Sequence, residues 1–170
     1  WLAARPGLRQ KLVLATKVSG PARGMDWIRG GVADMTKADI LASCDASLQR
    51  LRTDVIDLYQ SHRDDAETPQ EETLDAFANL IKAGKVRAIG ASNYSPDRLQ
   101  EALELSAKHG LPRYETFQPL YNLSDRAGFE GPLQDLCVRV EVLLPAAEER
   151  LVDLALSGVA ALYQLETAGT

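Results

Sequence analysis

The chain has 170 residues, within the usual size of one domain, and it is 45% hydrophobic and 25% charged, so it can bury a substantial core. Its net charge is −5, with acids and bases interspersed and no basic block, which argues against nucleic acid as a partner. No apolar run approaches the roughly 20 residues needed to cross a bilayer, so we expect no membrane partner.

Three apolar segments of strand length each end in a polar side chain. Residues 12–17 end in Lys17, residues 55–62 end in His62, and residues 86–93 end in Ser-Asn. A shorter fourth strand is predicted over 114–118, because Pro119 follows it. The carboxyl ends of parallel strands are where α/β proteins place their chemistry. We therefore expect Lys17, His62, Ser92-Asn93 and Gln118 to share one edge of a sheet.

Helical patterns separate these strands. Thr36 is placed to cap the first helix, Pro69 opens the second, and Ser95 caps the third. Gly84 and Gly110 follow the second and third helices in the position of a glycine cap. Helices that alternate with apolar strands predict right-handed βαβ units and a parallel sheet.

Two α/β architectures fit this order of elements, a (β/α)₈ TIM-type barrel and an open doubly wound sheet. No strand is followed by a Gly-x-Gly-x-x-Gly or Gly-Lys-Ser/Thr loop, which favours the barrel.

The polar strand ends each have a structural and a functional interpretation. Lys17 is either a solvated lysine or a charge that lowers the pKa of a neighbouring proton donor. His62 is either a hydrogen-bonded core histidine or an imidazole that orients a carbonyl group. Ser92 and Asn93 either cap a turn or, with Gln118, bind a carboxamide through its donor and acceptor edges.

Three aspartates and two cysteines also occur at informative positions. Asp57 is expected on the strand face opposite His62, paired with a helix residue, and Asp64-Asp65 form either a metal or acid pair or, as we favour, a solvated turn. Cys44 and Cys137 lie far apart in helical patterns, so we predict two buried thiols and a reducing, cytoplasmic compartment. No His or Cys cluster has metal-ligand spacing, and we expect no metal.

Together these segments resemble the aldo-keto reductase family. The matching stretches are Leu14-Ala-Thr-Lys17, Ser47-Leu-Gln-Arg-Leu-Arg-Thr-Asp54, Asp57-Leu-Tyr-Gln-Ser-His62, Glu71-Glu-Thr-Leu74, Lys82-Ala-Gly-Lys-Val-Arg-Ala-Ile-Gly-Ala-Ser-Asn93 and Gln118-Pro-Leu-Tyr-Asn122. The resemblance implies a (β/α)₈ barrel that binds NADPH and reduces a small aldehyde or ketone by hydride transfer. It also implies that Lys17 and His62 are catalytic, and that Ser92, Asn93 and Gln118 hold the nicotinamide carboxamide. NADH remains an alternative to NADPH.

The chain departs from the family pattern at both sides of this region. The family's catalytic Asp and Tyr precede the lysine, and the sixteen residues before Lys17 contain neither. After Arg139 the match is lost abruptly, which a reading-frame shift in the coding DNA or a spliced foreign tail would explain. We therefore divide the chain into a partial barrel over 1–139 and a divergent, helical tail over 140–170, with a fifth strand over 138–143 as a further option.

These departures lead to competing functional expectations. The first is an aldo-keto reductase-like oxidoreductase that is inactive as this truncated chain. The second is a non-catalytic remnant that self-associates through unclosed sheet edges. The third is a redox-sensing subunit that binds nucleotide without turnover.

Overall fold

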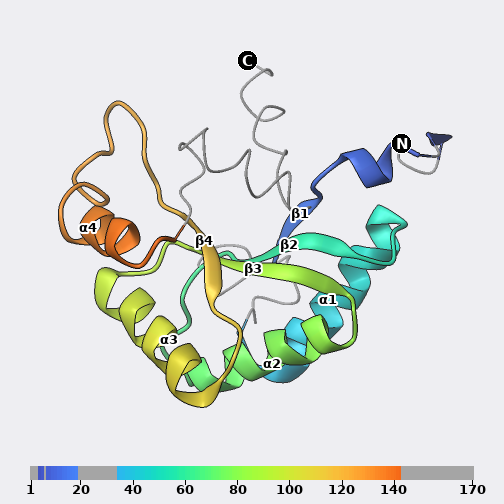
Figure 1. The fold of residues 1–170 in the computed structure, drawn as a ribbon, viewed down its shortest axis with the longest axis horizontal. Helices are drawn as coiled ribbons and strands as arrows, with labels where there is room; N and C mark the ends of the chain where they lie inside the picture. Colours follow the sequence, from blue (N-terminus) through green and yellow to red (C-terminus); the bar gives the residue numbers. More distant parts are fainter. Residues whose placement is uncertain (1–3, 6, 19–33, 143–170) are drawn as a thin grey trace.

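The computed structural model describes residues 4–5, 7–18 and 34–142, and four parallel strands form its single sheet (Figure 1). The strands lie side by side in chain order and are β1 (Ala15–Val18), β2 (Ile56–Ser61), β3 (Val86–Ser92) and β4 (Tyr114–Gln118). Within the described residues, β1 and β4 are the two edges of the sheet.

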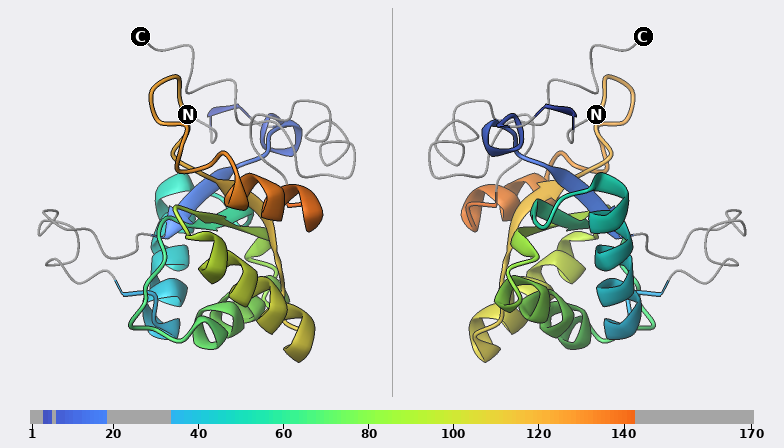
Figure 2. Two further views of the ribbon diagram at one scale, coloured as in Figure 1. Left: turned by 90° about the vertical axis from the view of Figure 1, so that its left-hand side faces the viewer. Right: turned by 90° about the vertical axis from the view of Figure 1, so that its right-hand side faces the viewer.

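A helix follows each strand, and the helices are α1 (Lys37–Leu51), α2 (Gln70–Lys82), α3 (Pro96–His109) and α4 (Pro132–Arg139). Helices α1, α2 and α3 cover one face of the sheet, as the side views show (Figure 2). A parallel sheet of consecutive strands with helices on one face is the strand-helix repeat of a (β/α)₈ barrel. The described residues therefore form an unclosed, partial barrel of this kind.

The predicted helix boundaries are confirmed. Thr36 accepts a hydrogen bond at 3.2 Å from the Asp39 amide, and Ser95 accepts one at 3.3 Å from the Arg98 amide. Gly84 and Gly110 follow their helices with φ of 72° and 64°, a left-handed conformation that glycine adopts without a steric penalty.

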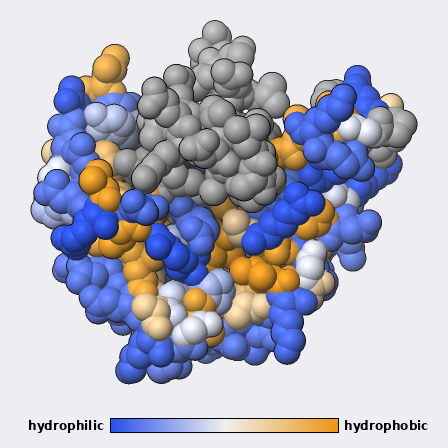
Figure 3. Space-filling view, in the orientation of Figure 1, coloured by the Kyte–Doolittle hydropathy of each residue, from blue (hydrophilic) through white to orange (hydrophobic). Residues whose placement is uncertain are grey.

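The core lies between the sheet and its helices. Tyr59 of β2, Phe77 of α2 and Tyr114 of β4 meet edge to face, with ring centroids 5.9 and 6.2 Å apart. Hydrophilic side chains form much of the molecule's periphery, and hydrophobic ones show toward the middle (Figure 3). No helix in the described part of the chain is both long and apolar enough to span a membrane.

A bulge in β4 sets which side chains face away from the helices. Tyr114 pairs with Ile89, but the next pair is Thr116 with Gly90, so Glu115 is the extra residue. A Cβ at position 90 would lie 2.2 Å from the Thr116 hydroxyl oxygen, so only glycine fits there without rearrangement. Because of the bulge, Phe117 is buried on the helix side and Gln118 returns to the opposite face.

Two sequence predictions differ from the structure. Residues 138–142 contain no strand, because Val138 and Arg139 lie in α4, where Leu133, Leu136 and Cys137 are buried at helical spacing, and residue 143 lies outside the described residues. The first strand begins at Ala15 rather than Leu12. From residue 143 onward, the predicted helical tail lies outside the described residues.

Candidate active site

The register of the sheet brings the predicted site residues to its carboxyl edge. Val18 pairs with Ser61, so His62 follows directly beside the end of β1. Ser92 pairs with Gln118 at the end of β3 and β4. We call the five residues at this edge the rim: Lys17, His62, Ser92, Asn93 and Gln118.

Hydrogen bonds hold the main chain of His62 from both sides. Its amide donates to the Val18 carbonyl at 3.1 Å, and its carbonyl accepts from the Asn93 side-chain amide, also at 3.1 Å. The Asn93 side chain thus spans from the end of β3 to the end of β2. Asn93 has a φ of 56°, and asparagine is one of the few residues with a side chain that tolerates this left-handed conformation.

Ser92, Asn93 and Gln118 form a second set of contacts. The Ser92 hydroxyl donates to the Gln118 carbonyl at 2.8 Å and lies 3.0 Å from the Asn93 amide nitrogen, which donates to it. The Asn93 main-chain amide also donates to the Gln118 carbonyl, at 3.3 Å. These bonds use the Asn93 amide nitrogen but leave its oxygen available, and the Gln118 side-chain amide has no hydrogen-bond partner in the described part of the chain.

Burial and neighbouring positive charges favour the neutral form of the His62 imidazole by lowering its pKa. Burial lowers the pKa of His62, and the positive charges of Lys17 and Arg63 lower it further. The ammonium of Lys17 makes no ion pair with any of the described residues. The rim therefore combines a cation that has no ion pair among the described residues with an imidazole whose neutral, hydrogen-bond-donating form is favoured.

Asp64 and Asp65, in the loop after β2, form neither a metal pair nor a solvated turn. Arg98 of α3 binds both oxygens of Asp64, at 2.7 and 2.9 Å. Asp65 is buried and accepts from the Met35 amide at 3.0 Å and the Thr68 hydroxyl at 2.6 Å. Burial alone would raise the pKa of Asp65, but these and further hydrogen bonds together lower it. The pair fastens the His62 loop to the segments on either side.

Asp57 lies at the opposite end of the strands. Its buried carboxylate pairs with Arg9 at 2.7 Å and with Arg87 at 2.8 Å. The expected helix partner is confirmed, because Arg9 belongs to the short 3₁₀ helix η2 (Arg9–Lys11), and Arg87 of β3 is a second partner. The two cysteines are buried free thiols, as predicted, and burial raises the pKa of each to about 11.

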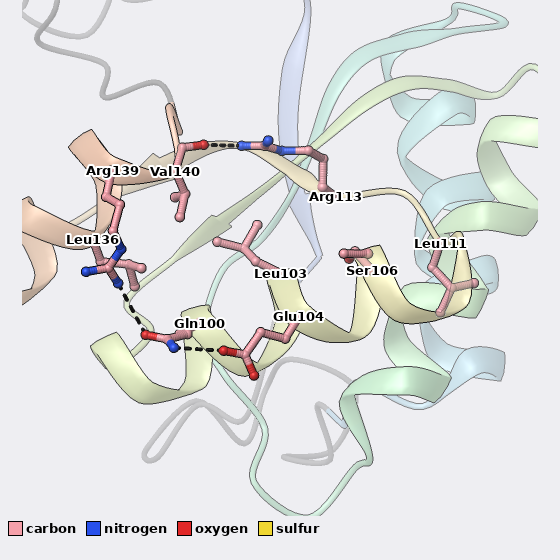
Figure 4. Close-up of a pocket in the computed structure, with 10 residues that line it drawn as sticks. Gln100, Leu103, Glu104, Ser106, Leu111, Arg113, Leu136, Arg139 and Val140 are labelled. Atoms are coloured by element: carbon pink, nitrogen blue, oxygen red, sulfur yellow. Dashed lines mark hydrogen bonds between the residues drawn. The ribbon is translucent and has the colours of Figure 1, made fainter.

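Of two cavities among the described residues, one is lined by a rim residue and the other is not. A cavity of about 440 Å³ is lined by Asn93 and by Pro119, which follows Gln118. A cavity of about 580 Å³ lies between α3 and α4, with Leu103 and Arg113 among its lining residues (Figure 4). Arg113 precedes β4, so the second cavity lies at the end of the strand remote from Gln118.

Sequence reasoning missed two contributors to this edge. Gln60 pairs with Lys17 across β1 and β2, and it is buried on the same face of the sheet as His62. The sequence indicates this shared face, because residues two apart on a strand point to the same side. Arg98 anchors the loop after His62, and no local pattern predicts a partner 34 residues away. No group of His, Cys, Asp or Glu that could hold a metal ion occurs in the described ranges.

Comparison with known proteins identifies the family. The profile of the aldo/keto reductase family matches residues 1–140. The chain is 34% identical over 155 residues to L-glyceraldehyde 3-phosphate reductase of Escherichia coli (strain K12), covering 89% of this chain and 43% of that protein. It is 39% identical over 154 residues to Protein tas of the same organism, covering 80% of this chain and 44% of that protein. It is 38% identical over 128 residues to aldo-keto reductase YhdN of Bacillus subtilis (strain 168), covering 75% of this chain and 35% of that protein.

The chain thus spans less than half the length of each of these three relatives. The family match covers all four described strands and the rim residues at their ends. The chain belongs to the aldo/keto reductase family of oxidoreductases.

Proposed function

We propose that the rim is part of an NADPH-dependent reductase site for small aldehydes or ketones. It would contain the lysine and the histidine of that site and the residues that bind the nicotinamide carboxamide. The observation that carries this proposal is the convergence of Lys17, His62, Asn93 and Gln118 on one edge of the sheet. In its family, hydride transfer to a carbonyl needs groups that bind the nicotinamide and groups that stabilise charge on the carbonyl oxygen.

The hydrogen-bonding groups left available at the rim fit a carboxamide. A carboxamide presents two N–H donors and one carbonyl acceptor. The Asn93 side-chain oxygen can accept one N–H, and the Gln118 amide can complement both edges of the ligand. The Ser92 oxygen accepts from Asn93 and keeps a second lone pair for a further N–H. When bound, NADPH would supply the hydride.

Lys17 and His62 would act on the carbonyl group of the substrate. A neutral imidazole at His62 donates a hydrogen bond to the carbonyl oxygen and so orients the reacting carbon. The Lys17 ammonium provides positive potential where negative charge develops on that oxygen. Both groups act by position and charge.

We further propose that this 170-residue polypeptide binds NADPH weakly and does not catalyse the reduction of a carbonyl substrate. The family's Tyr supplies the proton and its Asp supports the Lys-Tyr pair, and neither type occurs in the residues before Lys17. Tyr59 and Tyr94 do not replace the missing tyrosine, because both are buried on the helix side of the sheet.

The test is binding of NADPH and of NADH to the full chain, labelled with ¹⁵N and followed by NMR. We expect NADPH to shift the side-chain amide signals of Asn93 and Gln118, and Gln118→Ala to weaken binding several-fold. The matched control is Gln100→Ala, which removes an exposed glutamine at the remote cavity and leaves binding unchanged. Absence of any shift at the two rim amides at saturating NADPH would contradict the proposal.

A turnover assay on the same chain separates reductase from binding protein. We expect no NADPH oxidation with a panel of aldehydes. Turnover that a Lys17→Met substitution abolishes would contradict the proposed inactivity while supporting the site. Binding without turnover favours the second candidate function, a nucleotide-binding subunit.

Self-association and location belong to the same proposal. Leu123 is 96% exposed and Val138 is 70% exposed, and β1 and β4 end the described sheet without a further strand. Such surfaces favour association with a second chain. Buried reduced thiols at Cys44 and Cys137 support a cytoplasmic location.

A further inference from the structure

Three buried hydroxyl groups lie on the helix side of the sheet, directly behind the rim. The Ser61 and Tyr94 hydroxyl oxygens are 3.0 Å apart, and those of Tyr94 and Tyr114 are 3.2 Å apart. All three residues are at most 5% exposed. We call Ser61, Tyr94 and Tyr114 the hydroxyl chain.

The number of hydrogens fixes the direction of the hydroxyl chain. Ser61 donates its only hydroxyl hydrogen to the Arg63 carbonyl at 2.9 Å, so it must accept from Tyr94. Tyr94 has then used its own hydrogen and must accept from Tyr114. Each of the three hydroxyl hydrogens in the hydroxyl chain then has an acceptor, as buried polar groups require. Burial raises the pKa of Tyr94, so its hydroxyl stays protonated and remains a donor.

The hydroxyl chain and the rim join the same two strand ends from opposite faces. On the rim side, Asn93 donates from its side chain to the His62 carbonyl. On the helix side, the next residue, Tyr94, donates to Ser61, the residue before His62. Consecutive residues of one strand end are therefore bonded to consecutive residues of the other.

We propose that Tyr94 is a positioning residue whose hydroxyl, through Ser61, holds His62 and Asn93 in place beside Lys17. The inference rests on the proposed function for the meaning of that placement, but the placement can be measured without NADPH. Tyr94 does not touch the rim face itself and takes no part as a proton donor.

The test uses the ring signals of histidine in the full 170-residue chain without NADPH. The chain has two histidines, so in a His109→Gln background the only imidazole ring signals come from His62. We expect Tyr94→Phe to shift the midpoint of the His62 titration upward. Its pKa is lowered by burial and by Lys17, and a loosened corner weakens both effects. The Asn93 side-chain amide signal should move as well.

Two further variants make the result decisive. Ser61→Ala breaks the same link from the other end and should shift His62 in the same direction, which covers the case that Tyr94→Phe does not fold. Tyr59→Phe removes the hydroxyl of another buried tyrosine, two residues before Ser61 on the same strand, and should leave His62 unchanged.

An unchanged His62 midpoint in a folded Tyr94→Phe or Ser61→Ala variant would overturn the inference. An equal shift in Tyr59→Phe would overturn it too, because it would show general loosening of the core. Failure of the parent chain to bind NADPH would count against the proposed function alone.

Discussion

The two ends of the sheet treat charge in opposite ways. At the amino end, the buried Asp57 carboxylate is bound by Arg9, Arg87 and the Leu14 amide, at 2.7 to 2.8 Å. At the carboxyl end, Lys17 has no ion pair and Gln118 has no side-chain hydrogen bond among the described residues. The same strands connect both ends.

Under the proposed function, the difference follows from the role of each side chain. A side chain that binds a ligand has to keep donors or acceptors free, and it therefore contributes little to folding. A side chain that holds the strands together has its donors and acceptors bonded within the protein. In barrels of parallel strands, residues at the carboxyl ends act in chemistry and those at the amino ends in stability.

The largest expected effect is from Asp57→Asn. The substitution removes a fully buried negative charge and leaves two arginines facing one another. We expect the free energy of unfolding to fall by about 3 kcal/mol, the lower end of the range for breaking a buried pair, because Arg87 is half-exposed. Urea unfolding followed by circular dichroism measures the loss.

Arg87→Met is the matched control for this experiment. It removes the more exposed partner and leaves Asp57 paired with Arg9. We expect a loss of about 1 kcal/mol or less. Equal losses for the two variants would show that Asp57 is not the centre of the cluster.

A smaller effect is expected at the carboxyl end itself, from Asp65→Asn. Asp65 is buried, and its carboxylate accepts structural hydrogen bonds from Met35 and Thr68. Losing a charged acceptor for these donors should cost about 1–3 kcal/mol at neutral pH. This variant therefore tests whether bonding within the protein, rather than position along the strand, decides which groups stabilise the fold.

The stability that Asp65 contributes should depend on pH in a defined direction. The pKa of Asp65 is lower in the folded protein than its ordinary value of 3.8. Its contribution is therefore complete above the ordinary value and is lost as the pH falls through the lower, folded value. The difference between wild type and Asp65→Asn should shrink as urea unfolding is repeated toward pH 3. The exposed Asp135→Asn serves as control, and a difference that stays constant with pH would contradict the assignment.

The sequence was sufficient to predict the order of elements and the shared edge of the rim residues. Apolar runs ending in Lys17, His62 and Asn93 mark strand ends by local composition. Thr36 and Ser95 mark helix starts by side chains that bond three residues ahead. All these signals are local, so one sequence carries them.

The features that were predicted wrongly or missed depend on partners distant in the chain. Asp64 looks like a turn residue until Arg98 is placed beside it. The extra residue in β4 exists because Tyr114 and Phe117 both pack on the helix side, which requires the neighbouring strand. The apolar pattern of residues 138–143 predicts a strand only when the buried helix face that ends at Cys137 is ignored.

The smallest expected effect on stability is from Lys17→Met, and it sharpens the contrast most. Methionine keeps the apolar stem of the lysine in place, and no ion pair among the described residues is broken. The free energy of unfolding should change by no more than about 0.5 kcal/mol. The His62 titration midpoint should nevertheless rise, because the Lys17 charge is one cause of its lowered pKa. Urea unfolding and histidine NMR on one sample measure both quantities. A large loss of stability would place Lys17 with Asp57 among the structural charges, whereas an unmoved His62 would mean that the two groups do not share a site.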